Sequence, residues 1–301
     1  MSTDINNAGP AASRTLSIGA HAGRDRRAFQ LQRIAVWALL CIGAVIMLVP
    51  FLWLVSTSLK EQRQIFVYPP QWIPDPVAWQ NYPQALTSLP FGRYTVNTLF
   101  ITALTMIGVL LTSSLAAYAF ARLRFPGRDP IFMVLLSALM LPYAVIMIPQ
   151  YIMFKNLGWI DTYLPLIVPQ WFGGGIFNIF LLRQFFRTIP ADLIEAARID
   201  GAGEVRIYSQ IMLPLAGPAL AVVAIFTFIN TWNDFLPPLI YLSSQDNFTI
   251  ALGLSAFKGL YATQWNYLMA ASTVMILPII VLFFLTQRYF VQGIVMTGTK
   301  G

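Results

Sequence analysis

The chain has 301 residues, of which 57% are hydrophobic and 10% are charged, and its formal net charge is +7. A soluble domain carries about 25% charged residues, so this composition excludes an ordinary soluble protein. A positive net charge can indicate either a nucleic-acid-binding protein or a membrane protein whose basic residues lie on one side of the membrane. The placement of the charges along the chain decides between these two interpretations.

Six long windows of the sequence contain no charged residue. They are residues 34–59, 94–121, 131–154, 162–182, 207–233 and 259–287. A helix needs about 20 residues to cross about 30 Å of hydrocarbon, and it pairs its own backbone amides without water. The sequence therefore predicts an all-α integral membrane protein with six transmembrane helices.

The basic residues are divided unevenly between the segments that join these helices. If the N-terminus is cytoplasmic, the cytoplasmic segments hold 14 of the 19 basic residues: Arg14, Arg24, Arg26, Arg27, Arg33, Arg122, Arg124, Arg128, Arg183, Arg187, Arg198, Arg206, Arg288 and Lys300. The outer segments hold the other five, Lys60, Arg63, Arg93, Lys155 and Lys258. This is the positive-inside distribution, so the charge indicates topology and no nucleic-acid partner is expected. With six spans, both termini face the cytoplasm.

The first part of the chain is expected to be a tail followed by an anchor. Residues 1–29 are rich in Ala, Gly, Ser, Asn and Arg without apolar periodicity, which predicts a mobile cytoplasmic tail. The first span exceeds the core of about 7–15 residues of a signal peptide, so we interpret it as an uncleaved anchor. Cys41 lies within it and is expected to be a buried, inert thiol.

The predicted spans and charges divide the chain into segments. They are the tail at 1–29, the first span with a proline-rich outer loop at 30–92, the transmembrane core at 93–288 with a charged cytoplasmic loop at 183–215, and a cytoplasmic C-terminal tail at 289–301. Prolines interrupt the third, fourth and sixth spans, and the "FGGG" at 172–175 allows a break or a close backbone approach. Kinked helices around a central path favour a transporter over a passive anchor.

Ionisable residues are scarce in the predicted membrane region, where Asp234 near the outer end of the fifth span is the candidate. Ion-coupled carriers place such groups at mid-membrane, so this scarcity argues against an ion-driven carrier. Asn230, Trp232 and Asn233 surround Asp234. Amide and aromatic groups can bind sugar hydroxyls and stack on sugar rings, which predicts a substrate path. An interfacial cap on the helix end is the alternative, and both interpretations stay open.

Motifs for catalysis are missing from the sequence. The single histidine, His21, lies in the tail, which excludes a zinc-protease motif and a Ser-His-Asp triad. No phosphate-binding loop of the G-x-x-x-x-G-K-[ST] type is present. We therefore expect no enzyme, no metal site and no cofactor in this chain, and any ATP must be bound by another subunit.

A compact charged stretch, "EAARIDGAGEVRIYSQIMLPL", begins at Glu195 between two long apolar runs. Pro190 and Asp192 before it suit the first turn of a helix. Gly201 and Gly203 then turn the chain, and a second short helix returns toward the membrane. The pattern predicts a rigid bent segment that suits mechanical coupling, with an amphipathic segment lying on the membrane surface as the alternative.

The stretch "EAARIDGAG" followed by "IMLPL" resembles the EAA loop of permease subunits of ABC importers, with the EAA-x-x-x-G core and I-x-L-P intact. "NTWNDFLPPLIYL" and the closing "QRYFVQGIVMTGTKG" are similar to the carbohydrate-uptake, maltose-type branch. The resemblance extends from about Arg93 to the end of the chain. The long arginine-bearing N-terminal tail is a departure from the pattern.

The resemblance implies a type I importer fold and a defined set of partners. These are a second, non-identical permease subunit, two ATP-binding subunits and an extracellular solute-binding protein, in the cytoplasmic membrane of a prokaryote. The residues that it implies for docking to an ATP-binding subunit are Glu195, Ala196, Ala197, Asp200, Gly201 and Ala202, with Gly298, Lys300 and Gly301 as a C-terminal contact.

Together these features predict a permease subunit of an ATP-driven sugar importer. A permease for another solute, such as a sugar phosphate or a polyol, is the nearest alternative. An ion-coupled carrier would use Asp234 and need no partner, and a non-transporting scaffold would tolerate changes around Asp234.

Overall fold

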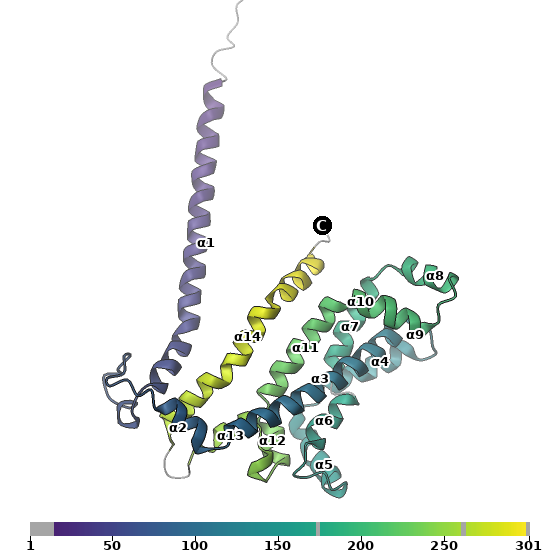
Figure 1. Ribbon diagram of the computed structural model, residues 1–301. Coiled ribbons are helices and arrows are strands. Elements are labelled where there is room, and N and C mark those ends of the chain that lie inside the picture. The colour runs from purple at the N-terminus through teal and green to yellow at the C-terminus, as the bar shows by residue number, and fades with distance from the viewer. Residues whose placement is uncertain (1–14, 173–174, 260–262, 299–301) are drawn as a thin grey trace, which may run out of the picture. The chain divides into compact units, whose positions relative to one another are not determined.

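The computed structural model describes residues 15–172, 175–259 and 263–298, and this described part is helical, without strands (Figure 1). The helices are α1 Thr15–Ser58, α2 Asn81–Ser88, α3 Phe91–Arg122, α4 Arg128–Ser137, α5 Tyr143–Asn156, α6 Leu164–Trp171, α7 Ile176–Thr188, α8 Ala191–Ile199, α9 Glu204–Ile207, α10 Leu213–Leu215, α11 Gly217–Trp232, α12 Leu236–Tyr241, α13 Ile250–Ser255 and α14 Trp265–Gly298. A π-helical segment, Tyr208–Met212, joins α9 to α10, and short 3₁₀ turns lie at Gln62–Gln64, Ala138–Met140 and Gln245–Asn247.

The chain divides into two compact units, residues 1–56 and residues 57–301, which are described separately. The first unit holds most of α1, whose segment Gln32–Ser58 is long and apolar enough to span a membrane. Two predictions change here. The helix begins at Thr15, inside the segment 1–29 that is predicted to be a mobile cytoplasmic tail, and residues 1–14 of that segment lie outside the described part. Cys41 is exposed and not buried, because the whole stretch of helix around it, residues 32–50, is exposed.

Four described helices can cross a membrane by length and composition, and six can if each of two bent pairs counts as one span. The prediction of six spans therefore holds with the bent pairs included. The third span, Arg128–Met140 with Tyr143–Asn156, bends by 97°. Leu141 has extended backbone angles there, as expected for a residue before a proline, Pro142.

The second bent pair changes the limits of the predicted fifth span. Glu204–Leu215 and Gly217–Trp232 meet at an angle of 76° at Ala216, so residues 207–233 do not form one straight helix. Pro214 and Pro218 flank the bend, and each removes a backbone donor from the helical ladder.

Helix α3 is the central helix of the second unit and packs against α6, α7, α11 and α13. Gly108 lies at a tight contact between α3 and α6. A Cβ atom at this position would lie 2.0 Å from the indole ring of Trp171 on α6. The same indole donates a hydrogen bond of 3.1 Å to the carbonyl of Leu104, so a glycine is required where α3 and α6 meet.

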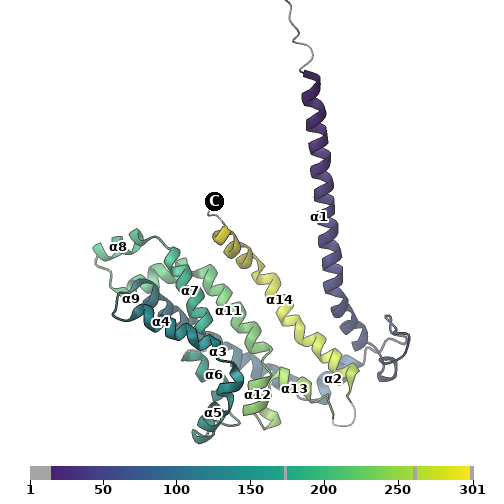
Figure 2. The same cartoon turned by 180° about the vertical axis from the view of Figure 1, so that it is seen from behind.

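Helix α14 packs against α2 and α11 and continues further than predicted. It ends at Gly298, so most of the segment predicted as a C-terminal tail at 289–301 is helical, and residues 299–301 lie outside the described part. Its C-terminal end and α8 lie at the same end of the second unit, opposite α2 and α13 (Figures 1 and 2).

Candidate functional site

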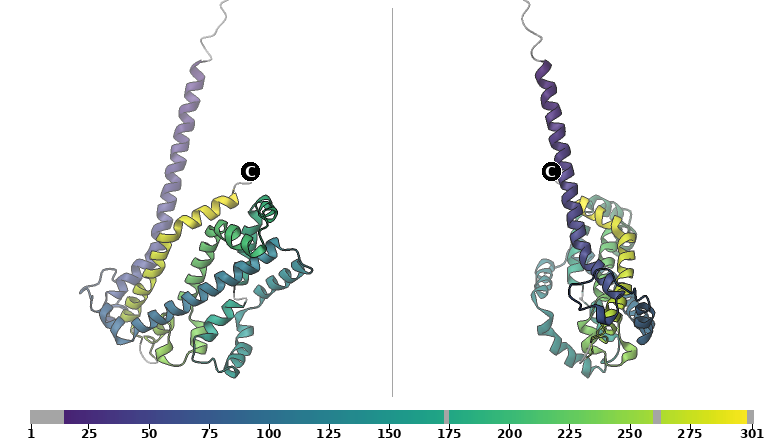
Figure 3. Two further views of the ribbon diagram at one scale, coloured as in Figure 1. Left: turned by 45° about the vertical axis from the view of Figure 1, so that its right-hand side comes forward. Right: turned by 90° about the vertical axis from the view of Figure 1, so that its left-hand side faces the viewer.

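Helices α8 and α9 with the turn between them form a bent projection, which we call the elbow (residues 190–207; Figure 3). Pro190 precedes α8, and Gly201 turns the chain with a φ of +81°. The amide of Ala202 donates to the carbonyl of Ala197 at 2.9 Å, which closes the end of α8. Residues with a side chain rarely adopt this φ, so the bend depends on Gly201.

Two hydrogen bonds join the elbow and its continuation to α3. The Tyr118 hydroxyl donates to a Glu204 carboxylate oxygen at 2.5 Å, and the hydroxyl groups of Ser114 and Tyr208 lie 2.7 Å apart. Arg198 holds the same carboxylate from within the elbow at 2.8 Å. A charged acceptor shared between two donors makes a strong junction, so the inner face of the elbow is fixed to α3.

The side chains of the elbow separate into an inner and an outer face. Ile194 and Ile207 are buried in the core that contains residues of α3, α7 and α11. Of the residues that the sequence suggests for docking, Glu195, Ala196, Asp200 and Gly201 are exposed, whereas Ala197 and Ala202 pack partly against that core.

Sequence reasoning missed two exposed apolar side chains on the elbow, Ile199 and Val205, which are 86% and 81% exposed. An apolar pair in the middle of a charged loop is the signal that could have identified them, because exposed apolar groups mark contact surfaces.

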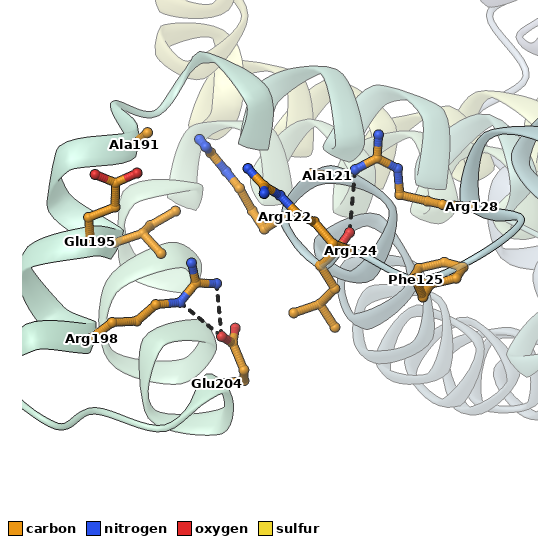
Figure 4. Close-up of a pocket in the computed structure, with 11 residues that line it drawn as sticks. Ala121, Arg122, Arg124, Phe125, Arg128, Ala191, Glu195, Arg198 and Glu204 are labelled. Atoms are coloured by element: carbon orange, nitrogen blue, oxygen red, sulfur yellow. Dashed lines mark hydrogen bonds and ion pairs between the residues drawn. The ribbon is translucent and has the colours of Figure 1, made fainter.

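A cleft of about 770 Å³ separates α8 from the connection between α3 and α4 (Figure 4). Its walls carry charged side chains. Glu195, Arg198 and Glu204 come from the elbow, and Arg122, Arg124 and Arg128 come from the end of α3, the connection and the start of α4.

A second, polar cavity of about 370 Å³ lies between α3, α6, α7 and α11. Hydroxyl, amide and carboxylate groups line it: Thr105, Gln170, Asn178, Thr227, Asn230, Thr231, Asn233 and Asp234, together with Val109. The hydroxyl oxygens of Thr105 and Thr227 are buried and make no hydrogen bond within the described residues. This lining can exchange hydrogen bonds with a ligand that carries several hydroxyl groups.

The structure brings three of the four predicted substrate-path residues, Asn230, Asn233 and Asp234, to this cavity. Trp232 is not among its lining residues. Its indole is buried, stacks on Phe228 at 5.5 Å and donates to the carbonyl of Met275 at 3.1 Å. A ring held in this way anchors α11 to α14 and is neither positioned to stack on a sugar in the cavity nor exposed as an interfacial cap.

The C-terminal residues suggested for docking are only partly described. Gly298 is the last residue of α14, and Lys300 and Gly301 lie outside the described part. Within the described residues, no group of three His, Cys, Asp or Glu side chains is arranged to hold a metal ion.

Comparison with known proteins gives a consistent result. The family described as the inner membrane component of binding-protein-dependent transport systems matches residues 108–296. The chain is 35% identical to the diacetylchitobiose uptake system permease protein NgcG of Streptomyces coelicolor, over 93% of this chain and 91% of that protein. It is 38% identical to the arabinooligosaccharides transport system permease protein AraQ of Halalkalibacterium halodurans, over 68% and 73% of the two chains.

A third relative has a different type of solute in its name. The sn-glycerol-3-phosphate transport system permease protein UgpE of Yersinia pestis is 36% identical over 85% of this chain and 94% of that protein. Among solved structures, a chain of a bacterial ABC transporter that imports alginate matches with a TM-score of 0.74 and 24% identity, covering 94% of this chain and 100% of that chain. That structural similarity supports the fold.

Proposed function

Because this chain belongs to the inner membrane components of binding-protein-dependent transport systems, we propose that it is a permease subunit of an ATP-driven importer that moves a sugar across the cytoplasmic membrane. Relatives named for diacetylchitobiose and arabinooligosaccharides support a sugar. The relative named for sn-glycerol-3-phosphate makes a sugar phosphate the second candidate. The polar cavity has a carboxylate, Asp234, and no cationic side chain in its lining, which favours a neutral sugar over a phosphate ester.

The elbow docks onto a separate ATP-binding subunit in this proposal. The observation that carries it is the division of the elbow into an exposed outer face and an inner face that is hydrogen-bonded to α3. Helix α3 also lines the polar cavity through Thr105 and Val109. A movement imposed on the elbow therefore has a direct route to the cavity.

The complete importer contains a second, non-identical permease subunit, two ATP-binding subunits and an extracellular solute-binding protein. Both termini lie on the cytoplasmic side, and the C-terminal end of α14 provides a second contact with the ATP-binding subunits. Its position at the same end of the unit as α8 is compatible with that contact (Figure 1). ATP binding shifts the population toward the outward-open state, and hydrolysis returns the path to the inward-open state.

Charge and backbone changes on the elbow test the coupling. Reversing a charge that is paired across an interface costs about 2–5 kcal/mol, so we expect Glu195→Lys to lower uptake by more than about tenfold. Gly201→Asp places a second carboxylate beside Asp200 at the bend and should have a similar effect. Sugar uptake, protein inserted in the membrane and co-purified ATP-binding subunit are measured together. Lys155→Glu, an exposed charge reversal outside the elbow, is the control. Normal uptake in both elbow variants would contradict the coupling role.

Substitutions in the polar cavity test the sugar path separately. We expect Asn230→Ala and Asn233→Ala to reduce uptake while the ATP-binding subunit still co-purifies, because both residues lie away from the elbow and line the cavity. If transport of every sugar tested remains at the wild-type level in both variants, the cavity is not part of the path.

A further inference from the structure

The cleft between α8 and the α3–α4 connection contains more positive charge than its own acidic groups balance. Two of its arginines are paired within the chain. Arg198 contacts Glu204 at 2.8 Å, and Arg128 contacts Asp129 at 3.1 Å. The carboxylates of Glu204 and Asp129 are therefore already paired and do not neutralise the other two arginines of the cleft.

Arg122 and Arg124 are the arginines of the cleft without a carboxylate partner in the described part of the chain. Arg122 donates to the backbone carbonyls of Phe186 and Ile189, while its Nε atom is buried and makes no hydrogen bond there. Arg187 lies close enough to repel it. Gathering like charges on a partly buried surface is unfavourable unless an anion is bound.

The acidic residue across the cleft does not neutralise these arginines. Glu195 lines the opposite wall, on α8, but no ion pair within 4.0 Å joins it to Arg122 or Arg124 (Figure 4). The cleft therefore has room for a small anion on its arginine-bearing side.

The position of the cleft indicates the chemistry of that anion. Arg122 ends α3, a helix long and apolar enough to span a membrane, and Arg128 begins α4. On α4, the next turns expose Ile131, Met133 and Val134, as expected of a surface that faces acyl chains. Arginines at this depth meet the phosphates of lipid headgroups, and the planar guanidinium group suits bidentate contact with phosphate.

We propose that this cleft binds a phosphate group, with Arg122 and Arg124 as its ligands. An anionic phospholipid headgroup and a free phosphate ion share this chemistry. Because α8 forms the other wall of the cleft, a bound phosphate lies beside the proposed docking helix. Phosphate binding therefore links the position of the elbow to the membrane surface. The site is assigned from charge and position alone and does not depend on the sugar path.

The test measures binding to the purified full-length protein in detergent. Phosphatidylglycerol, phosphatidylcholine or inorganic phosphate is added, and bound ligand is counted by native mass spectrometry. Arg124 is exposed, and its side chain makes no hydrogen bond or ion pair within the described part of the chain, so Arg124→Gln should fold normally. Loss of a hydrogen bond to a charged group weakens binding by roughly tenfold or more, which is the decrease expected for Arg124→Gln. Arg206→Gln, an exposed arginine of α9 outside the cleft, is the matched control.

The outcomes separate the possible ligands. A lipid headgroup is supported if the protein binds phosphatidylglycerol but not phosphatidylcholine, and if this binding is lost in Arg124→Gln and kept in Arg206→Gln. A free ion is supported if only inorganic phosphate binds, with the same effects of the two substitutions. Glu195→Gln should keep or strengthen phosphate binding while weakening association with the ATP-binding subunit, so the two proposals can fail independently. Equal binding by wild type and Arg124→Gln would overturn the phosphate site. Loss of the ATP-binding subunit from Arg124→Gln without any phosphate binding in the wild type would assign the cleft to protein docking instead.

Discussion

The hydrogen bond between Tyr118 and Glu204 couples α3 to the elbow, and Tyr118→Phe tests whether the two move together. The substitution removes one oxygen atom and keeps the ring, which contacts the rings of Phe186 and Tyr208 at centroid distances of 6.4 and 5.4 Å. A hydrogen bond to a charged group is worth about 1.5–3 kcal/mol. Because the Glu204 side chain is 43% exposed and keeps its contact with Arg198, we expect a loss of about 1–2 kcal/mol.

A loss of this size raises the population in which the elbow is detached from α3 by a factor of about 5–30. In proteoliposomes that contain the complete importer, the number of sugar molecules imported per ATP hydrolysed should fall. The ATP-binding subunit should still bind, because the outer face of the elbow is unchanged. Tyr267→Phe is the control, since it removes a comparable hydroxyl contact with Gln84 outside the elbow. An unchanged ratio of sugar to ATP in Tyr118→Phe would refute the claim that this bond transmits the movement.

Two further substitutions test other parts of the bundle. Gly108→Ala should lower the free energy of unfolding of the purified protein by about 1–3 kcal/mol, because the new methyl group meets Trp171 and overpacks the contact between α3 and α6. The measurement is the melting temperature, and a value equal to that of the wild type would show that the two helices move apart without cost. At Asp161, the hydroxyl of Ser244 and the amides of Ser244 and Ser243 donate to the carboxylate and lower its pKa. This stabilisation is present above the unfolded pKa of about 3.9 and is lost as the pH falls below it. The wild type should therefore be more stable than Asp161→Asn at neutral pH, and this difference in stability should shrink below about pH 4. A difference in stability that does not change with pH would exclude the carboxylate charge as its cause.

The membrane helices and the bend of the elbow were predictable because each depends on local chemistry. Uncharged windows of sufficient length predict membrane spans. Gly201 after "EAARID" predicts a turn that needs a positive φ, and the φ of Gly201 in the structure is +81°. The sharp bend at Ala216 was not predicted. The prolines on either side were visible, but the angle depends on how α11 packs against α3 and α14.

The position of Trp232 shows what helical geometry adds to composition. Each residue of an α-helix turns by about 100°, so within α11 Trp232 is about 200° from Asn230, on the opposite side, while Asn233 and Asp234 follow the end of the helix. Thr227 shares the face of Asn230, and it also lines the cavity. Proximity in sequence suggested one site for the whole "NTWND" cluster, whereas helical spacing assigns its tryptophan to packing. Gln170 and Asn178 could not be assigned in this way, because they reach the cavity from two other helices.

The same geometry favours α3 over α11 as the route from the elbow to the cavity. Tyr118 and Thr105 are 13 residues apart on α3, or about 20 Å along one helix that contains no proline between them. Helix α11 also lines the cavity, but the chain bends by 76° between it and the elbow, and a bend can absorb displacement. A continuous helix moves as a rigid body, so a displacement of the elbow changes the α3 wall of the cavity directly. The tight contact at Gly108 lies between the two positions and extends that movement to α6, which provides Gln170 to the same cavity.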